Sequence, residues 1–141
     1  MSQFLEFARN HPLLIGGFLV ALVLLVISEI ARHMRGYQEI GPSLAVQRIN
    51  RQDNVVVDIS SAADFNKGHI LAARHLPMSQ LSGGGPEIEK LAAKAVLVVC
   101  KNGQTAHQAA ARLVKMGCKD VAVLKGGMSQ WQADNFPLSK S

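Results

Sequence analysis

The chain contains very little cysteine. Only Cys100 and Cys118 occur among its 141 residues. Small exported domains are usually rich in disulfides, so this count favours a reducing compartment. No CxxC pair and no Cys/His cluster accompanies either cysteine, so neither a zinc site nor a thioredoxin-like dithiol is supported. We therefore expect no metal ion and no organic cofactor.

Strong charge is also lacking. The formal net charge is +5, and charged residues make up 18% of the chain. Beyond Gly36, twelve Lys and Arg stand against eight Asp and Glu, a balance of +4. This excess is too small to indicate a nucleic-acid partner, although it suits a position near an anionic membrane leaflet.

The apolar residues that the chain does have are concentrated near its beginning. Nineteen residues from Asn10 to Ser28 carry no formal charge. A helix of that length spans roughly 28 Å, close to the hydrocarbon thickness of a bilayer. We predict a tail over 1–10, one transmembrane helix over 11–30 and a juxtamembrane linker over 31–42.

Two other interpretations of this segment are weaker. A secretory signal needs a positive leader and a small-residue cleavage site, whereas Glu29 and Arg32 follow the apolar run. A buried core helix would need far more chain to cover it than is available here. Arg32, His33 and Arg35 outweigh the lone Arg9, so the positive-inside tendency predicts an outside amino terminus and a cytoplasmic domain at the inner (plasma) membrane.

Strand and helix patterns alternate over the remaining hundred or so residues. β-branched runs predict strands at Val55–Ile59 and Val121–Leu124, and an unbroken apolar run predicts another at Ala95–Val99. Helices are expected over 43–49, 60–65, 87–94 and 106–116 and around Trp131, with a flexible break over 82–86. This order predicts an α/β domain over 43–138, with a mostly parallel sheet and helices on both faces.

The segment Cys100–Thr105 is the clearest chemical signal in the chain. It joins the predicted buried strand to the predicted helix, so the thiol stands beside the unpaired N–H groups and positive end of a helix. Such surroundings favour the thiolate form. The same amides can hold an anionic group beside the sulfur.

Three separated blocks of sequence resemble the rhodanese-like domain family. The first holds Asp58-Ile59, Asp64-Phe65 and Gly68-His69-Ile70. The second holds Cys100–Thr105 with Ala109-Ala110, Leu113 and Gly117, and the third holds Val121, Leu124, Gly126-Gly127 and Trp131. Their order and spacing make the resemblance specific over about residues 43–137.

The resemblance implies a sulfurtransferase activity. Cys100 would be the nucleophile that accepts a sulfane sulfur from a donor such as thiosulfate or a persulfide, and would pass it to a thiophilic acceptor such as a protein thiol. The backbone amides of Lys101, Asn102, Gly103, Gln104 and Thr105 would stabilise the thiolate and the persulfide. Lys101 would supply positive charge, and the Thr105 hydroxyl would bond the sulfur or a donor oxygen.

The chain departs from the family pattern at several positions. Ser60 replaces a frequent arginine and Leu71 a frequent glycine. Some thiosulfate-using members carry two basic residues where this chain has Lys101 and Asn102, which weakens the case for thiosulfate as the donor. A related phosphatase would need an arginine where Ala106 and His107 stand, so phosphoryl chemistry is disfavoured.

The remaining candidates have simpler structural interpretations. Asp58, His69 and His75 are expected to be structural, His107 to face solvent, and Trp131 to anchor the last helix in the core. Cys118 is expected to be a bystander rather than a resolving thiol. A role in lining the site is expected for Gly126-Gly127, which follows a strand at the same end of the sheet as Cys100. The alternative to an enzyme is a catalytically quiet docking or scaffold module for membrane machinery.

Overall fold

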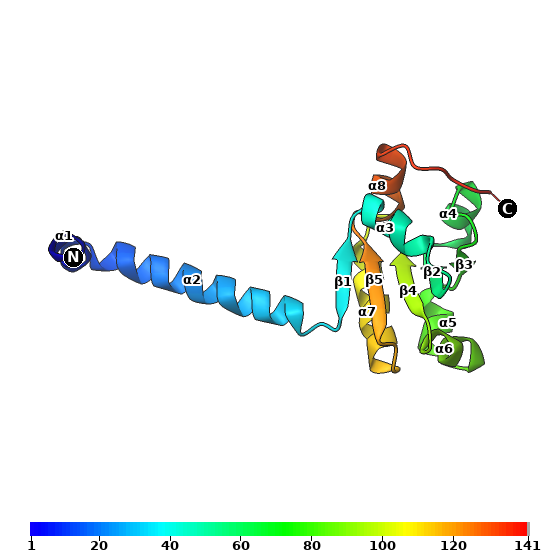
Figure 1. The fold of residues 1–141 in the computed structure, drawn as a ribbon, viewed down its shortest axis with the longest axis horizontal. Coiled ribbons are helices and arrows are strands. Elements are labelled where there is room, and N and C mark those ends of the chain that lie inside the picture. Colours follow the sequence, from blue (N-terminus) through cyan, green and yellow to red (C-terminus); the bar gives the residue numbers. More distant parts are fainter. Residues whose placement is uncertain (141) are drawn as a thin grey trace. The chain divides into compact units, whose positions relative to one another are not determined.

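The computed structural model describes residues 1–140 and separates the chain into two compact units, Met1–Arg35 and a second unit that begins at Gly36. The first unit contains α1 (Ser2–Asn10) and α2 (Pro12–His33) (Figure 1). The segment expected to be a simple tail is therefore a helix. None of the residues of α2 is buried by the rest of the described chain, and its length and composition are those of a helix that can cross a membrane.

The second unit is built on a five-stranded parallel sheet (Figure 1). Its strand order is β1-β5-β4-β2-β3, and every neighbouring pair is parallel. The strands are β1 (Tyr37–Ile40), β2 (Asn54–Asp58), β3 (Arg74–His75), β4 (Ala95–Val99) and β5 (Asp120–Leu124). The predicted α/β class is confirmed, and the three predicted strands correspond to β2, β4 and β5.

The linker prediction was wrong for residues 37–40. These residues form β1 and pair with β5, with Tyr37 opposite Val121 and Ile40 opposite Leu124. A four-residue strand containing Gln38 and Glu39 gives almost no local signal, because its stability comes from a partner strand far away in sequence.

The described part of the second unit contains six helices. They are α3 (Pro42–Ile49), α4 (Ala62–Lys67), α5 (Met78–Ser82), α6 (Pro86–Leu91), α7 (Gln104–Lys115) and α8 (Gly127–Ala133). All of them except α4 contribute buried residues to the faces of the sheet. Ser61 caps α4, since its side chain accepts a hydrogen bond from the Asp64 amide. Helix α5 extends into the expected flexible break, which is reduced to the three glycines 83–85.

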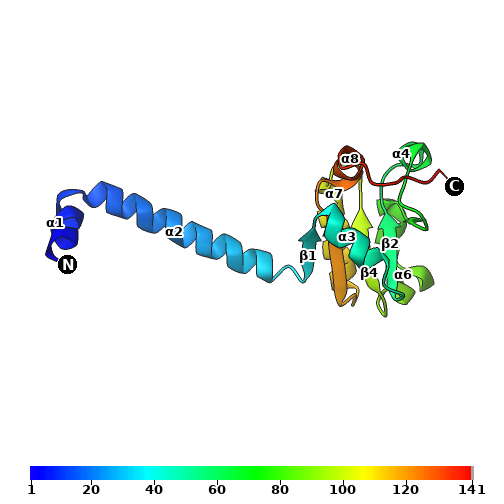
Figure 2. The ribbon, with the colours of Figure 1, turned by 45° about the horizontal axis from the view of Figure 1, so that its top comes forward.

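Alternate residues of the central strands build two separate cores. Val96 and Val98 of β4 pack on the face that carries α5, α6 and α7, whereas Leu97 and Val99 pack on the face that carries α3 and α8. Figure 2 shows α3 and α8 in relation to the strands. Burial on both faces explains why β4 is an unbroken apolar run.

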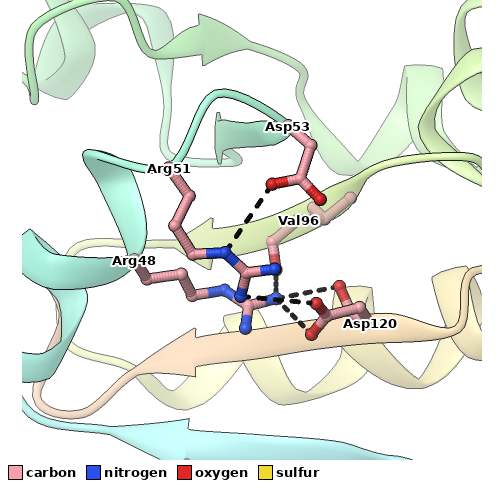
Figure 3. Close-up of polar contacts among 5 residues, drawn as sticks. All are labelled: Arg48, Arg51, Asp53, Val96 and Asp120. Atoms are coloured by element: carbon pink, nitrogen blue, oxygen red, sulfur yellow. Dashed lines mark hydrogen bonds and ion pairs between the residues drawn. The ribbon is translucent and has the colours of Figure 1, made fainter.

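Arg48 connects α3 to the strand ends that lie opposite Cys100 (Figure 3). Its guanidinium donates hydrogen bonds to the carbonyl oxygens of Val96 and Asp120, at 3.2 and 2.9 Å, and to the Asp120 carboxylate at 2.7 Å. The Arg48 side chain is 11% exposed, whereas Arg51, which pairs with Asp53 and Asp120 at 3.7 and 3.9 Å, is 53% exposed. Arg48 therefore holds three elements together from a largely buried position.

Candidate active site

Cys100 lies directly after β4, at the carboxyl end of the sheet. Its residue is 3% exposed, and its side chain joins the core beneath α7. The amide of Gly103 donates a hydrogen bond to the Cys100 Sγ atom at 3.0 Å. This contact places a backbone N–H donor directly against the sulfur of the candidate nucleophile.

The segment Cys100–Thr105, here called the Cys100 loop, turns back toward the sulfur and leads into the first residues of α7. Gly103 is the N-cap of α7 and has a left-handed φ of +90°. The Asn102 side-chain oxygen accepts a hydrogen bond from the Gln104 amide at 3.3 Å. Because the chain reverses at Gly103, its amide points back to the sulfur that the preceding strand delivers.

The predicted set of amide donors is divided between two tasks. Gly103 serves the sulfur and Gln104 serves Asn102, while the N–H groups of Lys101, Asn102 and Thr105 have no hydrogen-bond acceptor among residues 1–140. The side chains of Lys101, Asn102, Gln104 and Thr105 are exposed. Within the same residues no hydrogen bond joins the Thr105 hydroxyl to Cys100. The loop thus combines backbone donors that have no acceptor in the described chain with one exposed lysine next to Cys100 in sequence.

The first residues of α8 donate hydrogen bonds to the backbone of the Cys100 loop. The Met128 amide donates to the Cys100 carbonyl oxygen at 2.8 Å, and the Ser129 amide donates to the Lys101 carbonyl oxygen at 2.9 Å. The Ser129 hydroxyl donates to the same Lys101 oxygen at 2.9 Å. Nothing in the sequence around Ser129 distinguishes it from an ordinary helix residue, so sequence reasoning missed this contact.

Gly127 is required because the loop backbone passes directly against it. A Cβ atom at Gly127 would lie 2.3 Å from the Cys100 carbonyl oxygen and 2.6 Å from the Gly103 nitrogen. A Cβ atom at Gly103 would in turn lie 3.0 Å from the Gly126 nitrogen. The two glycine segments therefore allow a backbone-to-backbone contact between the Cys100 loop and α8.

The residues at the end of β2 lie next to the end of β4, which carries Cys100. The Ile59 amide donates to the Val99 carbonyl oxygen at 2.9 Å, so the residues after β2 follow the strand that delivers Cys100. Buried Asp58 accepts hydrogen bonds from the backbone amide and the hydroxyl of Ser60. The structural interpretation of Asp58 is confirmed.

Two histidines are held in a ring stack around Phe65. The ring centroid of Phe65 lies 3.8 Å from that of His69 and 4.7 Å from that of His75. His69 Nδ1 is 2.8 Å from the Phe65 carbonyl oxygen, and His75 Nε2 is 2.7 Å from the Ser60 carbonyl oxygen. These contacts give both imidazoles a structural role, as the sequence predicted.

The prediction that His107 faces solvent was wrong. Its Nε2 atom lies 2.8 Å from the Glu39 carboxylate, and its Nδ1 atom lies 3.2 Å from the Tyr37 hydroxyl. Both partners belong to β1, which the sequence interpretation treated as linker, so the pairing was not foreseeable. His107 instead attaches the first turns of α7 to the edge of the sheet.

Cys118 lies at the far end of α7 from Cys100. At about 1.5 Å per residue the twelve residues of α7 extend roughly 18 Å, whereas a disulfide requires Cα atoms within about 7 Å. Burial raises the pKa of the Cys118 thiol above its ordinary value. Both observations support a bystander role. Among residues 1–140 no cluster of three His, Cys, Asp or Glu side chains is arranged to hold a metal ion.

Comparisons with known proteins agree with this geometry. The rhodanese-like domain family matches residues 42–134. An uncharacterized protein of Escherichia coli (strain K12), YibN, is 32% identical over 139 residues, which cover 98% of this chain and 97% of that protein. The thiosulfate sulfurtransferase GlpE of Pseudomonas putida (strain GB-1) is 35% identical over 102 residues, covering 71% and 89% of the two chains.

A solved structure shows the same fold. The crystal structure of a rhodanese-related protein from Thermoplasma volcanium matches with a TM-score of 0.64 at 23% identity, covering 74% of this chain and 100% of the other. A match to the family over most of the second unit, a relative at 35% identity and this shared fold lead to one conclusion. The chain belongs to the rhodanese-like domain family.

Proposed function

We propose that this protein is a membrane-anchored sulfurtransferase that carries a sulfane sulfur on Cys100 as a persulfide. The observation that carries the proposal is the hydrogen bond from the Gly103 amide to the Cys100 sulfur at 3.0 Å. It lies in the loop that joins β4 to α7. The similarity to a thiosulfate sulfurtransferase at 35% identity supports the same chemistry.

The first step is an attack of the Cys100 thiolate on the outer sulfur of the donor. With thiosulfate, a bond forms between Cys100 Sγ and that sulfur while the sulfur–sulfur bond of thiosulfate breaks. Sulfite leaves with the bonding electron pair, so no external oxidant or reductant is needed. The unpaired amides of Lys101, Asn102 and Thr105 and the Lys101 ammonium would bind the negatively charged oxygens of the donor.

The second step transfers the outer sulfur to a thiophilic acceptor. Cyanide or an acceptor thiolate attacks the terminal sulfur of the persulfide, and the Cys100 thiolate leaves. The Gly103 amide stabilises the charge that returns to Sγ in this step. A protein thiol is the acceptor class we propose, because a thiolate is a thiophilic nucleophile of the kind that this step requires.

The test is performed on the full chain in detergent. Incubation with thiosulfate should increase the intact mass by one sulfur atom, and cyanide should remove that mass and release thiocyanate. Cys100→Ala should show neither effect. Cys118→Ala is the matched control, since it removes the other thiol and should retain both. A sulfur adduct that persists in Cys100→Ala would contradict the assignment.

A docking module is the second candidate, and the burial of Cys100 favours it. A residue that is 3% exposed presents little sulfur to a donor unless the Cys100 loop opens. If several donors leave Cys100 unmodified, and Cys100→Ser supports the same cellular phenotype as the unaltered protein, then docking is the function and the loop is only a structural feature.

We propose that α2 crosses the inner (plasma) membrane once, with the amino terminus outside and the rhodanese-like domain in the cytoplasm. The support is a 22-residue helix with no buried residues and two basic residues, Arg32 and His33, in its last turn. Arg35 adds to this side, and Arg9 alone stands on the other. The soluble domain proposed here occupies residues 43–138, preceded by β1 as part of the same sheet.

Protease accessibility tests this topology. In cells whose outer barriers have been removed, protease should leave the domain intact, and it should digest the domain after the inner membrane is opened. Digestion of the domain before the inner membrane is opened would show the opposite orientation. Release of the domain from the membrane after cleavage near residue 30 would instead show that α2 is a signal sequence.

A further inference from the structure

Helix α1 has two chemically distinct sides. At 100° per residue, one side of α1 carries Phe4, Leu5, Phe7 and Ala8. The opposite side carries Ser2, Gln3, Glu6, Arg9 and Asn10. This separation of apolar and polar residues is complete over the whole helix. Such a pattern marks a helix that lies at a boundary between an apolar and a polar phase.

Most of the apolar side is uncovered in the described chain, where Phe7 makes a tilted ring contact with His11 at 4.8 Å between centroids. Phe4 is 68% exposed, Leu5 66% and Phe7 49%, and neither hydrophobic core includes them. Helix α1 shares its compact unit only with α2, and none of its residues is buried there. The side chains of Phe4, Leu5 and Phe7 therefore need an apolar environment from outside residues 1–140.

The junction with α2 prevents α1 from continuing the membrane-spanning helix. Pro12 has no amide hydrogen and disfavours a helical conformation at the residue before it, and His11 accordingly adopts φ −130° and ψ 63°. Figures 1 and 2 both show α1 turned away from the line of α2. The two helices are therefore separate segments joined by one non-helical residue.

The length of α2 sets the depth of this junction. Its 22 residues extend about 33 Å at 1.5 Å per residue, slightly more than the hydrocarbon core of about 30 Å. When α2 crosses the bilayer, His11 must therefore lie at the boundary between the acyl chains and the headgroups. Helix α1 ends at Asn10, directly before His11, and no linker between them would carry α1 away from that boundary.

We infer that α1 is an interfacial helix that lies in the plane of the membrane, on the leaflet remote from the rhodanese-like domain. Phe4, Leu5 and Phe7 enter the outer part of the acyl region, while Glu6 and Arg9 face headgroups and water. The inference rests on the proposed membrane span of α2. An interfacial helix at one end fixes both the depth and the rotation of the span about its axis, which a flexible tail does not do.

Fluorescence quenching on the full chain in vesicles of phosphatidylcholine and phosphatidylglycerol tests the inference. Three variants place tryptophan on the apolar side of α1 (Phe4→Trp), on its polar side (Gln3→Trp) and in the middle of α2 (Leu22→Trp). Lipids brominated near the headgroup or near the chain end report depth, and iodide on both sides of the vesicle reports water. Trp131 also fluoresces and is 3% exposed in the folded domain. Its signal is measured in the unaltered chain and subtracted as background.

The expected pattern separates the three positions. Phe4→Trp is quenched most by shallow bromines, Gln3→Trp most by iodide, and Leu22→Trp most by deep bromines. Equal iodide quenching of Phe4→Trp and Gln3→Trp would overturn the interfacial helix, since both sides of α1 would then face water. Protection of Phe4→Trp from both bromines and iodide would also overturn it and indicate that protein covers the face. Failure of Leu22→Trp to respond to deep bromines would refute the span itself.

Discussion

Replacing Gly127 with alanine adds one methyl group at the place where α8 meets the Cys100 loop. The new Cβ atom would lie 2.3 Å from the Cys100 carbonyl oxygen, 2.6 Å from the Gly103 nitrogen and 2.8 Å from the Lys101 carbonyl carbon. All three atoms belong to the backbone. The methyl group cannot be accommodated by a side-chain rotation, so the loop and α8 must move apart.

Two costs add at this position. The left-handed φ of +61° at Gly127 costs an L-residue about 1 to 2 kcal/mol. Overpacking against fixed atoms costs typically about 1 to 3 kcal/mol. We therefore expect Gly127→Ala to lower the free energy of unfolding by about 2 to 5 kcal/mol. Separation of α8 from the loop also lengthens the hydrogen bond from the Met128 amide to the Cys100 carbonyl oxygen.

Gly84→Ala is the matched control. Gly84 also has a left-handed φ, +65°, but no atom lies within 4 Å of its Cβ position. It should lose only the conformational part, about 1 to 2 kcal/mol. Urea denaturation of both variants measures the stability, and the rate of sulfur loading onto Cys100 from thiosulfate measures the loop geometry.

The two variants are expected to differ in both assays. Gly127→Ala should be the less stable and should load sulfur more slowly even under conditions where it remains folded, whereas Gly84→Ala should load at the unaltered rate. Equal stability losses in the two variants would show that the close approach of the two backbones has no energetic consequence. Unchanged loading in folded Gly127→Ala would show that α8 does not hold the loop.

Three further predictions concern the fold. Arg48→Met should lower the free energy of unfolding by about 2 to 4 kcal/mol, because it removes largely buried, charge-assisted hydrogen bonds to Val96 and Asp120. Arg51→Met, at a 53% exposed side chain, should lose less than about 1 kcal/mol, and similar losses of the two variants in urea denaturation would contradict this. Burial raises the pKa of the Cys118 thiol above its ordinary value, so at alkaline pH the unfolded chain releases a proton that the folded protein keeps, and stability should fall as the pH rises through this range. Cys118→Ala should make the decline shallower, and an unchanged slope would refute this cause. Trp131→Phe should lose about 1 to 3 kcal/mol, since it removes the hydrogen bond from Nε1 to the Pro137 carbonyl oxygen and leaves space in the core beside Phe136; a thermal melt equal to that of the unaltered chain would refute it.

Local pattern was sufficient for the features that depend on neighbouring residues. The strand before Cys100 is a continuous apolar run because both of its faces are buried, and the loop and helix after it follow from the glycine at position 103 and the helix-forming residues beyond it. The capped helix after Ser61 and the long apolar helix near the amino terminus are local in the same sense. Sequence alone was therefore enough for the fold class and for the choice of Cys100 as the candidate nucleophile.

The amphipathic pattern of α1 is also local, although residues 1–10 were predicted to be a tail. Phe4, Phe7 and Ala8 recur at helical spacing, and Pro12 marks the boundary with the next helix. This signal was present in the sequence, but the long apolar run beside it dominated the interpretation of the first thirty residues.

Only the tertiary structure decided how the site is held. The contact between Ser129 and Lys101 joins residues 28 positions apart, and the contact between Tyr37 and His107 joins residues 70 positions apart. Neither pair has a local pattern, because each side chain looks like an ordinary surface residue until the sheet brings its partner close. The sequence determined which thiol stands at the end of a strand, and parallel pairing of distant strands determined that α8 and β1 would hold the loop and helix around it.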